Sequence, residues 1–300
     1  MPLSRRALLS TAGATALVAL APPPAVAAPH RRHRGATTAE LIPLQGAVNV
    51  RDLGGYLTYG GDRVRRGLVY RGDALGKLTD ADLTTLSGLR LGSVVDFRVP
   101  LEVRSDGADR LPGGLVPVAR PVTDNGLNAL IRSAIGSGDP VKQEEMLGGG
   151  RAPAFMAEVY RSFVTSADNR ARFAATIRDV ARPGGRPLLY HCTSGKDRTG
   201  WLSYLLLTVV GVPERYVVED FLASNTFRAA HDAHLREGLR QSGLMRNPEL
   251  LIPMQEVRLP YLEAALAEVR RGYGGLFRYL TVGLGLEPRT LAELQDRLVD

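Results

Sequence analysis

The 300-residue sequence predicts an α/β protein with a central, mostly parallel sheet flanked by helices and an additional C-terminal helical layer or lid. Short apolar runs typical of buried strands alternate with segments whose apolar residues recur at helical spacing. With 44% hydrophobic and 23% charged residues, the composition is that of an ordinary globular protein. The single cysteine, Cys192, lies between a short apolar run and a long one, which is where a parallel sheet passes its chain to a helix.

The first 28 residues are expected to be an export signal and to take no part in the fold. Arg5 and Arg6 precede an apolar run from Ala7 to Ala21, which has the length of a signal core and is too short to span a bilayer comfortably. Small residues at 25–28 offer a cleavage site, and "SRRALL" resembles bacterial twin-arginine signals. We therefore expect a secreted protein with no stable membrane insertion after cleavage, an uncleaved anchor being the alternative.

Residues 29–40 are expected to form a basic linker, followed by one folded domain over residues 41–300. The formal net charge of +7 falls to +5 without Arg5 and Arg6, and to +2 without the three arginines of the linker. The folded part is therefore nearly neutral, which argues against nucleic acid as a partner. The linker is either solvated or in contact with an anionic surface.

A single cysteine forms no internal disulfide, and we expect a monomer without a cofactor.

The first half of the domain is expected to alternate strands with one helix. Residues 45–56 are rich in turn residues, and residues 125–150 are rich in Gly and Ser, which favours a loop or mobile insertion. Thr79 is a good N-cap for a helix within residues 78–90, and Gly88 lies near the end of that helix. The expected elements are a strand at 68–70, a helix at 78–90, an apolar strand at 91–98 and a strand at 114–122 that prolines interrupt.

The second half is expected to be mainly helical around one buried strand. Helices are expected at 153–166 and 167–182, a strand at 186–192, and a central apolar helix at 197–211. Further helices follow, with breaks at Pro213, Pro248, Pro253, Pro260 and Pro288. Residues 225–260 form either a lid over a site or an additional helical layer, and the pattern does not distinguish the two.

The segment "HCTSGKDRTG" (191–200) is a polar loop between two apolar elements, and it has the residues of a phosphate site. Backbone amides at a helix start lack partners, and the helix dipole favours negative charge there. Gly195 permits a tight turn, and Arg198 can hold two phosphate oxygens through its planar guanidinium. The expected phosphate-binding residues are Thr193, Ser194, Gly195, Lys196, Asp197, Arg198 and Thr199.

The same surroundings favour Cys192 as a working thiol over buried filler. Amide donors, a helix start and Arg198 would keep its sulfur ionised at neutral pH, so that it can attack phosphorus and form a phosphocysteine. Thr199 can offer its hydroxyl to the leaving sulfur, and His191 is better placed to orient the thiol than to act as a base. The mechanism needs no metal, and we see no clustered His and carboxylate set in the sequence.

The loop resembles the signature of cysteine-dependent phosphatases. Its "GKDRTG" form is similar to bacterial tyrosine phosphatases of the mycobacterial phosphatase B type, which overlap in activity with phosphoinositide phosphatases. The segments "NVRDLGGY" (49–56), "VVDFRVPLEVRSDG" (94–107) and "DFLASN" (220–225) resemble further motifs of that family. The resemblance implies a phosphatase-like fold, no cofactor, and a phosphotyrosine protein or a phosphoinositide as substrate.

A tyrosine leaving group needs a proton, and the candidate acids are Asp96, Asp124 and Asp197. Asp124 follows the strand at 114–122 and opens a flexible segment, and the resemblance matches the family's general acid to it. Asp197 lies inside the signature loop and is expected either to assist proton transfer or to favour particular phosphates. Asp96 and Arg98 are expected to form a supporting pair under the loop. Three further expectations concern surrounding residues: Arg51 and Asp52 brace the floor of the site, Lys196 either favours multiply charged substrates or points to solvent, and Asn225 positions a neighbour or ends a helix.

The sequence thus predicts a secreted tyrosine phosphatase with Cys192, Arg198 and Asp124 as catalytic residues. One alternative is a phosphoinositide or dual-specificity phosphatase with the same chemistry. An alternative from another class is a non-catalytic phosphate-binding module, which would keep Arg198 and the loop amides but lack the acid.

Overall fold

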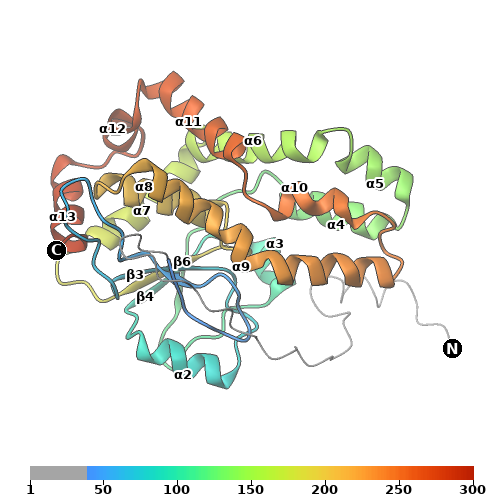
Figure 1. The fold of residues 1–300 in the computed structure, drawn as a ribbon, viewed down its shortest axis with the longest axis horizontal. Helices are drawn as coiled ribbons and strands as arrows, with labels where there is room; N and C mark the ends of the chain where they lie inside the picture. The colour runs from blue at the N-terminus through green and yellow to red at the C-terminus, as the bar shows by residue number, and fades with distance from the viewer. Residues whose placement is uncertain (1–38) are drawn as a thin grey trace.

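A six-stranded mixed sheet forms the centre of the protein in the computed structural model, which describes residues 39–300 (Figure 1). The expected export signal and nearly all of the basic linker lie outside the described residues. The strand order is β1-β2-β3-β6-β4-β5. The strands are β1 (Glu40–Leu41), β2 (Arg51–Asp52), β3 (Val69–Gly72), β4 (Ser93–Asp96), β5 (Pro117–Ala119) and β6 (Leu188–His191).

Four strands, β3, β6, β4 and β5, run parallel, and β1 and β2 extend the sheet antiparallel. The α/β prediction with a mostly parallel sheet is confirmed. In the register, His191 at the end of β6 lies level with Gly72 on one side and Asp96 on the other. Three parallel strands therefore end at the same level, and Cys192 leaves the sheet at its centre.

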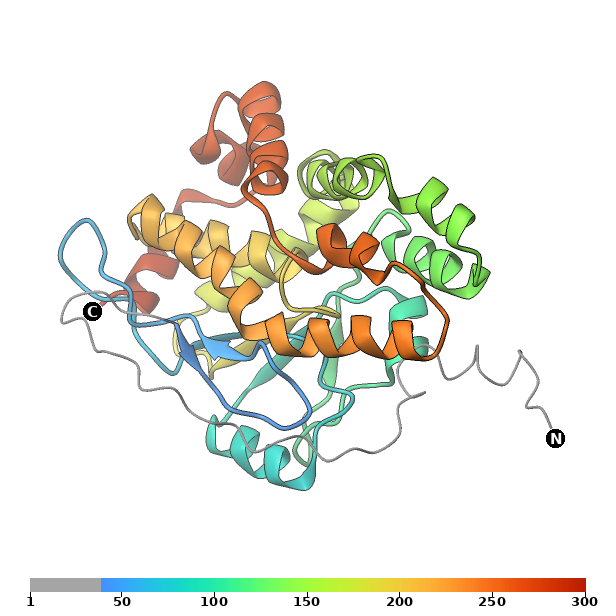
Figure 2. The same cartoon turned by 45° about the vertical axis from the view of Figure 1, so that its right-hand side comes forward.

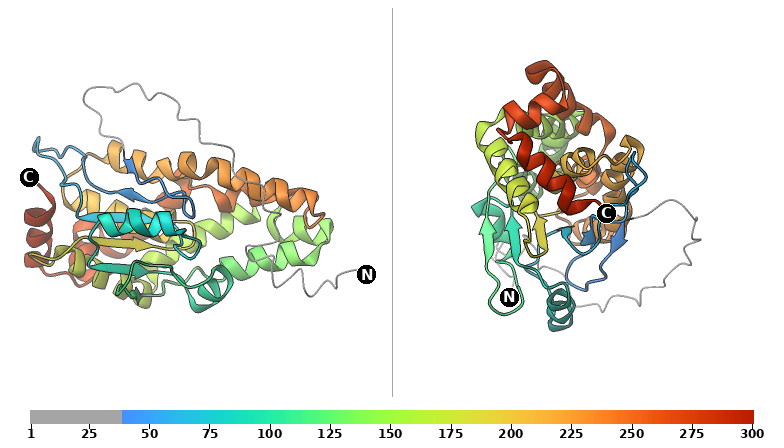
Figure 3. Two further views of the ribbon diagram at one scale, coloured as in Figure 1. Left: turned by 90° about the horizontal axis from the view of Figure 1, so that it is seen from below. Right: turned by 90° about the vertical axis from the view of Figure 1, so that its left-hand side faces the viewer.

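Both faces of the sheet are buried, which explains why its strands read as continuous apolar runs. On one face, Val94 and Leu189 pack with Leu86 of α2 (Asp80–Gly88). On the other face, Val95 and Tyr190 pack into the larger core beneath the remaining helices. Figure 1 shows α2 alone below the sheet, with the long helices above it, and Figure 3 shows the same layers from two other sides.

The predicted helices form where their sequence signals place them. Thr79 caps α2 by accepting a hydrogen bond from the Asp82 amide at 3.3 Å, and the Asp82 carboxylate accepts from the Thr79 amide at 2.9 Å. The other α-helices are α3 (Pro100–Asp106), α4 (Leu127–Ser137), α5 (Pro140–Leu147), α6 (Arg151–Thr165), α7 (Ala167–Ala181), α8 (Arg198–Val209), α9 (Glu214–Gln241), α10 (Ile252–Gln255), α11 (Leu259–Tyr273), α12 (Leu276–Arg278) and α13 (Pro288–Leu298). A 3₁₀ turn, η1 (Pro248–Leu251), and a π turn, η2 (Tyr279–Gly283), complete the described elements.

The prediction of a loop over residues 125–150 is wrong, because this segment forms α4 and α5. Its glycines stand at the helix ends: Gly126 and Gly138 have φ of 85° and 58° and flank α4. Asp139 caps α5, and Pro140 occupies its first turn. Most glycines of this segment therefore mark helix boundaries, and the apolar residues between them pack against the core.

The proline breaks are located correctly, since four of the five prolines are the first or second residue of a helix or turn and Pro213 precedes α9. The segment 225–260 is an additional helical layer: α9 runs on to Gln241, η1 packs on α9, and α10 packs on α6. Figure 2 shows α9, α10 and the α4–α5 pair side by side, beyond the end of the sheet where the parallel strands finish. Asn225 lies inside α9, so it does not end a helix.

Over residues 39–300, none of the helices combines the length and the apolar character that crossing a membrane would require.

Candidate active site

Residues 192–198 form the turn that joins β6 to α8. Cys192 is 1% exposed, and six positions later α8 begins at Arg198. Gly195 has a φ of +65°, and a Cβ at this position would lie 2.4 Å from the carbonyl oxygen of Gly72. Both its conformation and its close approach to β3 therefore require glycine.

The carbonyl groups of this turn are held outward by donors from other parts of the chain. The amide of Ala74 donates to the Thr193 carbonyl, the side chains of Asn49 and Arg228 donate to that of Ser194, and those of Asn49 and Arg71 donate to that of Gly195. Within the described part of the chain, the amides of residues 193–198 donate to no protein group. With its carbonyls turned away and its amides free at a helix start, the turn forms an anion-binding cradle.

Glu102 of α3 fixes the guanidinium of Arg198. Two hydrogen bonds of 2.6 and 2.5 Å join the Arg198 Nη1 and Nη2 atoms to the two carboxylate oxygens. Burial works against the charge of Arg198, but Glu102 and Cys192 raise its pKa above the ordinary value. Burial likewise works against the Glu102 carboxylate, and Arg198 holds the pKa of Glu102 below its ordinary value. Both groups are therefore charged over the physiological range.

Two threonine hydroxyl groups that lie near the cysteine in the chain have partners in the site. The Thr199 hydroxyl donates to the Cys192 sulfur at 3.2 Å, which is the contact expected from the sequence. On the other side of the cysteine, the Thr193 hydroxyl donates to Glu102 Oε1 at 2.7 Å. A hydroxyl donor at sulfur stabilises its anionic form.

Asp124 lies at the same site but not in a flexible segment. It is 6% exposed, and its carboxylate caps α4 by accepting from the amides of Gly126 at 3.0 Å and Asn128 at 2.8 Å. Its charge contributes to raising the pKa of Arg198, whose Nη1 atom donates to the carbonyl of Val122, two residues before Asp124, at 3.3 Å. The start of α4 thus positions Asp124 rigidly beside the cradle.

Lys196 does not point to solvent, which was one of the two alternatives from the sequence, and its ammonium is paired with a neighbouring carboxylate. Lys196 is 2% exposed, and its ammonium contacts both carboxylate oxygens of Asp197, at 2.8 and 2.7 Å. The Tyr160 hydroxyl of α6 donates to the same carboxylate at 2.9 Å. Burial and the neighbouring Asp197 raise the pKa of Tyr160, so this hydroxyl remains a donor.

The expected pair of Asp96 and Arg98 is present, and it is part of a larger cluster that reaches His191. Arg98 contacts Asp96 at 2.9 Å and Asp109 at 2.7 Å, and Asp109 contacts the His191 Nε2 atom at 2.8 Å. Asp96, Asp109 and His191 therefore do form a His and carboxylate cluster, which sequence reasoning missed. The Arg98 guanidinium already occupies oxygens of both carboxylates, which leaves a poor site for a cation.

Asn225 has the positioning role. Its side chain accepts from the Val257 amide and donates to the Val257 carbonyl, both at 2.8 Å, and so fixes the segment between α10 and α11. Arg51 lies in the floor of the cradle through its contacts with Asn49 and Asp220. Asp52 does not brace that floor, because its carboxylate accepts from the amides of Gly54 and Gly67 in a turn away from the cradle.

Several residues of the site were not identified from the sequence. Glu102 stands in the quoted segment 94–107, and its place in a family motif was the one signal that could have revealed it. Asp220 likewise stands in a quoted segment, 220–225. Asp109 and Arg71 carried no such signal as individual residues, because their partners are distant in the chain.

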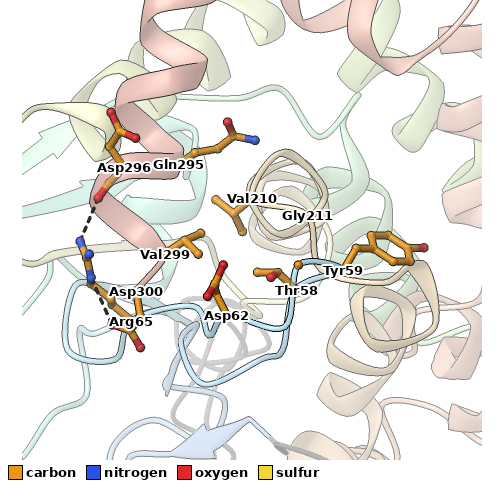
Figure 4. Close-up of a pocket in the computed structure, with 11 residues that line it drawn as sticks. Thr58, Tyr59, Asp62, Arg65, Val210, Gly211, Gln295, Asp296, Val299 and Asp300 are labelled. Atoms are coloured by element: carbon orange, nitrogen blue, oxygen red, sulfur yellow. Dashed lines mark hydrogen bonds and ion pairs between the residues drawn. The ribbon is translucent and has the colours of Figure 1, made fainter.

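A surface pocket of about 490 Å³ lies away from the cradle. It is lined by residues around Tyr59, Gly211 and Asp300, at the end of α8 opposite the cradle (Figure 4). No residue expected in the active site lines it. The cradle with its thiol, and not this pocket, is the site whose groups can perform chemistry.

Comparison with known proteins agrees with the interpretation of the cradle as a phosphate site. A model of the tyrosine phosphatase family matches residues 42–300, so the chain belongs to that family and is a protein tyrosine phosphatase, a phosphoric monoester hydrolase. A protein of Cupriavidus necator, provisionally named a tyrosine-protein phosphatase, is 34% identical over 80% of this chain and 82% of its own length.

Two further relatives carry related names. The triple specificity protein phosphatase PtpB of Mycobacterium tuberculosis is 29% identical over 79% of this chain and 91% of its own length. A tyrosine-protein phosphatase of Nostoc commune is 26% identical over 75% and 71%. The resemblance stated from the loop motif is confirmed, and the alternative of a non-catalytic binding module loses its support.

Proposed function

We propose that the protein hydrolyses phosphotyrosine through a phosphocysteine on Cys192. The observation that carries the proposal is the arrangement of free amides, the Arg198 guanidinium and the Thr199 hydroxyl around one buried sulfur. The amides and Arg198 bind the phosphate oxygens, and the sulfur attacks phosphorus while the bond to the tyrosine oxygen breaks.

Asp124 supplies the proton in this scheme. It protonates the leaving tyrosine oxygen, and its carboxylate then takes a proton from the water that attacks the phosphocysteine. The phosphorus–sulfur bond breaks, phosphate leaves, and Thr199 stabilises the released thiolate. The rigid placement of Asp124 beside Arg198 at the start of α4 supports this role.

Two variants test the chemistry on an aryl phosphate such as p-nitrophenyl phosphate. Cys192→Ser is expected to remove turnover, and Asp124→Asn to lower kcat by about 10²–10⁴-fold and to abolish the limb of the pH profile that needs the acid. Asp139→Asn, at the exposed cap of the next helix, is the matched control and is expected to leave both unchanged. Undiminished turnover by Cys192→Ser would refute the mechanism, and an unchanged pH profile in Asp124→Asn would remove Asp124 as the acid.

A second candidate function is phosphoinositide or dual-specificity hydrolysis by the same residues. The relative named a triple specificity phosphatase favours it. Comparing kcat/KM for a phosphotyrosine peptide, a phosphoserine peptide and an inositol lipid decides between the substrates. We expect the phosphotyrosine peptide to give the highest value.

We also propose that residues 1–28 direct export by the twin-arginine route. The paired arginines and the apolar run that follows support this. N-terminal sequencing of protein from the culture medium should begin near residue 28 or 29, and Arg5→Lys with Arg6→Lys should retain the protein in the cells. Protein found only in the cells, for the unaltered chain, would contradict the proposal.

A further inference from the structure

Beneath the cradle lies a buried group of three charged residues, Arg51 of β2, Arg71 of β3 and Asp220 of α9. Arg51 Nε contacts one Asp220 oxygen at 3.0 Å, and Arg71 Nη1 contacts the other at 2.6 Å. Both arginine side chains are 0% exposed, and that of Asp220 is 1% exposed. Two guanidinium groups thus share one carboxylate, which leaves a formal charge of +1 away from solvent.

This charge is in direct contact with the cradle. Arg71 Nη2 donates to the Gly195 carbonyl at 2.8 Å and lies close to Gly200 in the first turn of α8. Within the described part of the chain, the Arg71 Nε atom has no hydrogen-bond partner. Arg51 contacts the cradle indirectly, through Asn49. Its Nη1 atom donates to the Asn49 side-chain oxygen, and the Asn49 side-chain nitrogen donates to the Ser194 and Gly195 carbonyls.

The other charged groups around the cradle are balanced or negative. Arg198 is paired with Glu102, and Lys196 with Asp197. The remaining neighbours are Arg98 with Asp96, Asp109 and His191, Arg228 with Asp73 and Asp232, and the carboxyl groups of Asp106 and Asp124. Among the ion pairs of residues 39–300 that touch the cradle, the Arg51–Asp220–Arg71 group therefore has the unbalanced positive charge.

The two arginines remain a source of positive potential. Burial and the like charge of Arg71 lower the pKa of Arg51, while the two guanidinium groups hold the pKa of Asp220 below its ordinary value despite its burial. An unbalanced charge in a site that excludes water acts over several ångströms with little screening.

We propose that Arg71 is a positioning residue of the phosphatase reaction: it turns the Gly195 carbonyl out of the cradle, and the unbalanced charge of the Arg51–Asp220–Arg71 group stabilises the thiolate and the bound oxyanion from behind. The proposal rests on the proposed function, since it assumes that the cradle binds phosphate beside an ionised Cys192. In this proposal, the charges on β2 and β3 stabilise the thiolate and the oxyanion together with Arg198 of α8, whose own charge is paired with Glu102.

The test measures two quantities that a purely structural role would not move together. The first is the pH midpoint of Cys192 alkylation by iodoacetamide, and the second is the Kd for vanadate. Arg71→Met removes the charge and is expected to raise the midpoint by about one pH unit and the Kd by about tenfold. Arg71→Lys keeps the charge and is expected to stay within about threefold of the unaltered protein in Kd.

Arg297→Met is the matched control for the loss of a partly buried arginine. Arg297 donates to backbone carbonyls near α13, including those of Val180 and Gly185, and none of its partners belongs to the cradle. It is expected to lower Tm without changing the midpoint or the Kd. Thermal unfolding of every variant separates loss of fold from loss of charge.

An unchanged midpoint and Kd in folded Arg71→Met would overturn the proposal, and so would an Arg71→Lys variant that loses as much as Arg71→Met. Should Arg71→Met not fold, Arg51→Met removes the same formal charge one step further from the cradle, and an unchanged midpoint there would overturn it equally. Failure of the proposed function would give a different result: the unaltered protein would bind no vanadate, and the Cys192→Ser variant would turn over as fast as the unaltered protein.

Discussion

Replacing Glu102 by glutamine tests how strongly the enzyme depends on the group that holds Arg198. The carboxylate accepts four hydrogen bonds: two from Arg198, one from the Thr193 hydroxyl at 2.7 Å and one from the Val99 amide at 2.8 Å. A glutamine amide keeps one acceptor oxygen and places an NH₂ group against two of these donors. Two hydrogen bonds are lost, at least one of them to a charged donor.

The magnitude follows from this count. Hydrogen bonds to charged groups contribute about 1.5–3 kcal/mol each, and breaking a buried ion pair costs about 3–5 kcal/mol. We therefore expect Glu102→Gln to lower the free energy of unfolding by about 3–5 kcal/mol. Misplacement of Arg198 should reduce kcat/KM for an aryl phosphate by about 10²–10³-fold, which is the usual effect of losing one oxyanion donor.

The stability that Glu102 contributes should also depend on pH. Because the folded-state pKa of Glu102 lies below its ordinary value of 4.5, its contribution to stability is complete above about pH 4.5 and is lost as the pH falls through the folded-state pKa. The difference in unfolding free energy between the unaltered protein and Glu102→Gln should therefore shrink below pH 4.5. Denaturant unfolding at several pH values measures it.

An exposed pair provides the control. Glu158→Gln removes one of the two acidic partners of Arg161, whose side chain is 40% exposed, and should change stability by less than about 1 kcal/mol. If Glu102→Gln retains full kcat/KM and the same stability as this control, then Glu102 does not position Arg198 and the account of the cradle is wrong.

Two further predictions concern backbone positions around the cradle. Gly195→Ala places a Cβ 2.4 Å from the Gly72 carbonyl oxygen and should lower kcat/KM more than 100-fold, whereas Gly243→Ala, with a similar φ of +71° but open space, should leave it unchanged; equal kcat/KM for the two variants would refute the close-approach argument. Asn225→Ala removes both hydrogen bonds to Val257 and should speed amide hydrogen exchange around Val257 severalfold, while exchange at the unaltered rate would show that α9 does not fix this segment.

The sequence was sufficient to predict the central features because they are local. The strand, turn and helix around Cys192 follow from an apolar run, a glycine and a second apolar run, and the structure has them as expected. The misjudged segment at 125–150 shows the limit of composition. There, glycine and serine were counted as loop residues, although at helix ends they favour the helix that lies between them.

The groups around the cysteine could not be predicted in the same way, because their contacts join distant parts of the chain. Glu102 and Arg198 are 96 positions apart, and Arg71 and Asp220 are 149 apart. Neither pairing leaves a periodic pattern in the sequence, since each depends on where the sheet brings its strand ends together. Family motifs contained both acidic residues, but a motif alone does not say which arginine each one faces.

The pairing of Lys196 alters the argument about substrate choice. The sequence left two alternatives for its ammonium, a charge that favours substrates with a second phosphate or a group that points to solvent. In the structure it is bonded to Asp197, and Tyr160 donates to the same carboxylate. A second phosphate must therefore displace a carboxylate that is already well bound before it reaches the ammonium. The free energy gained by such a substrate is a difference between two similar ion pairs in one buried place, which is much smaller than the attraction of a free ammonium. We therefore expect any preference for inositol lipids to arise from contacts outside the cradle.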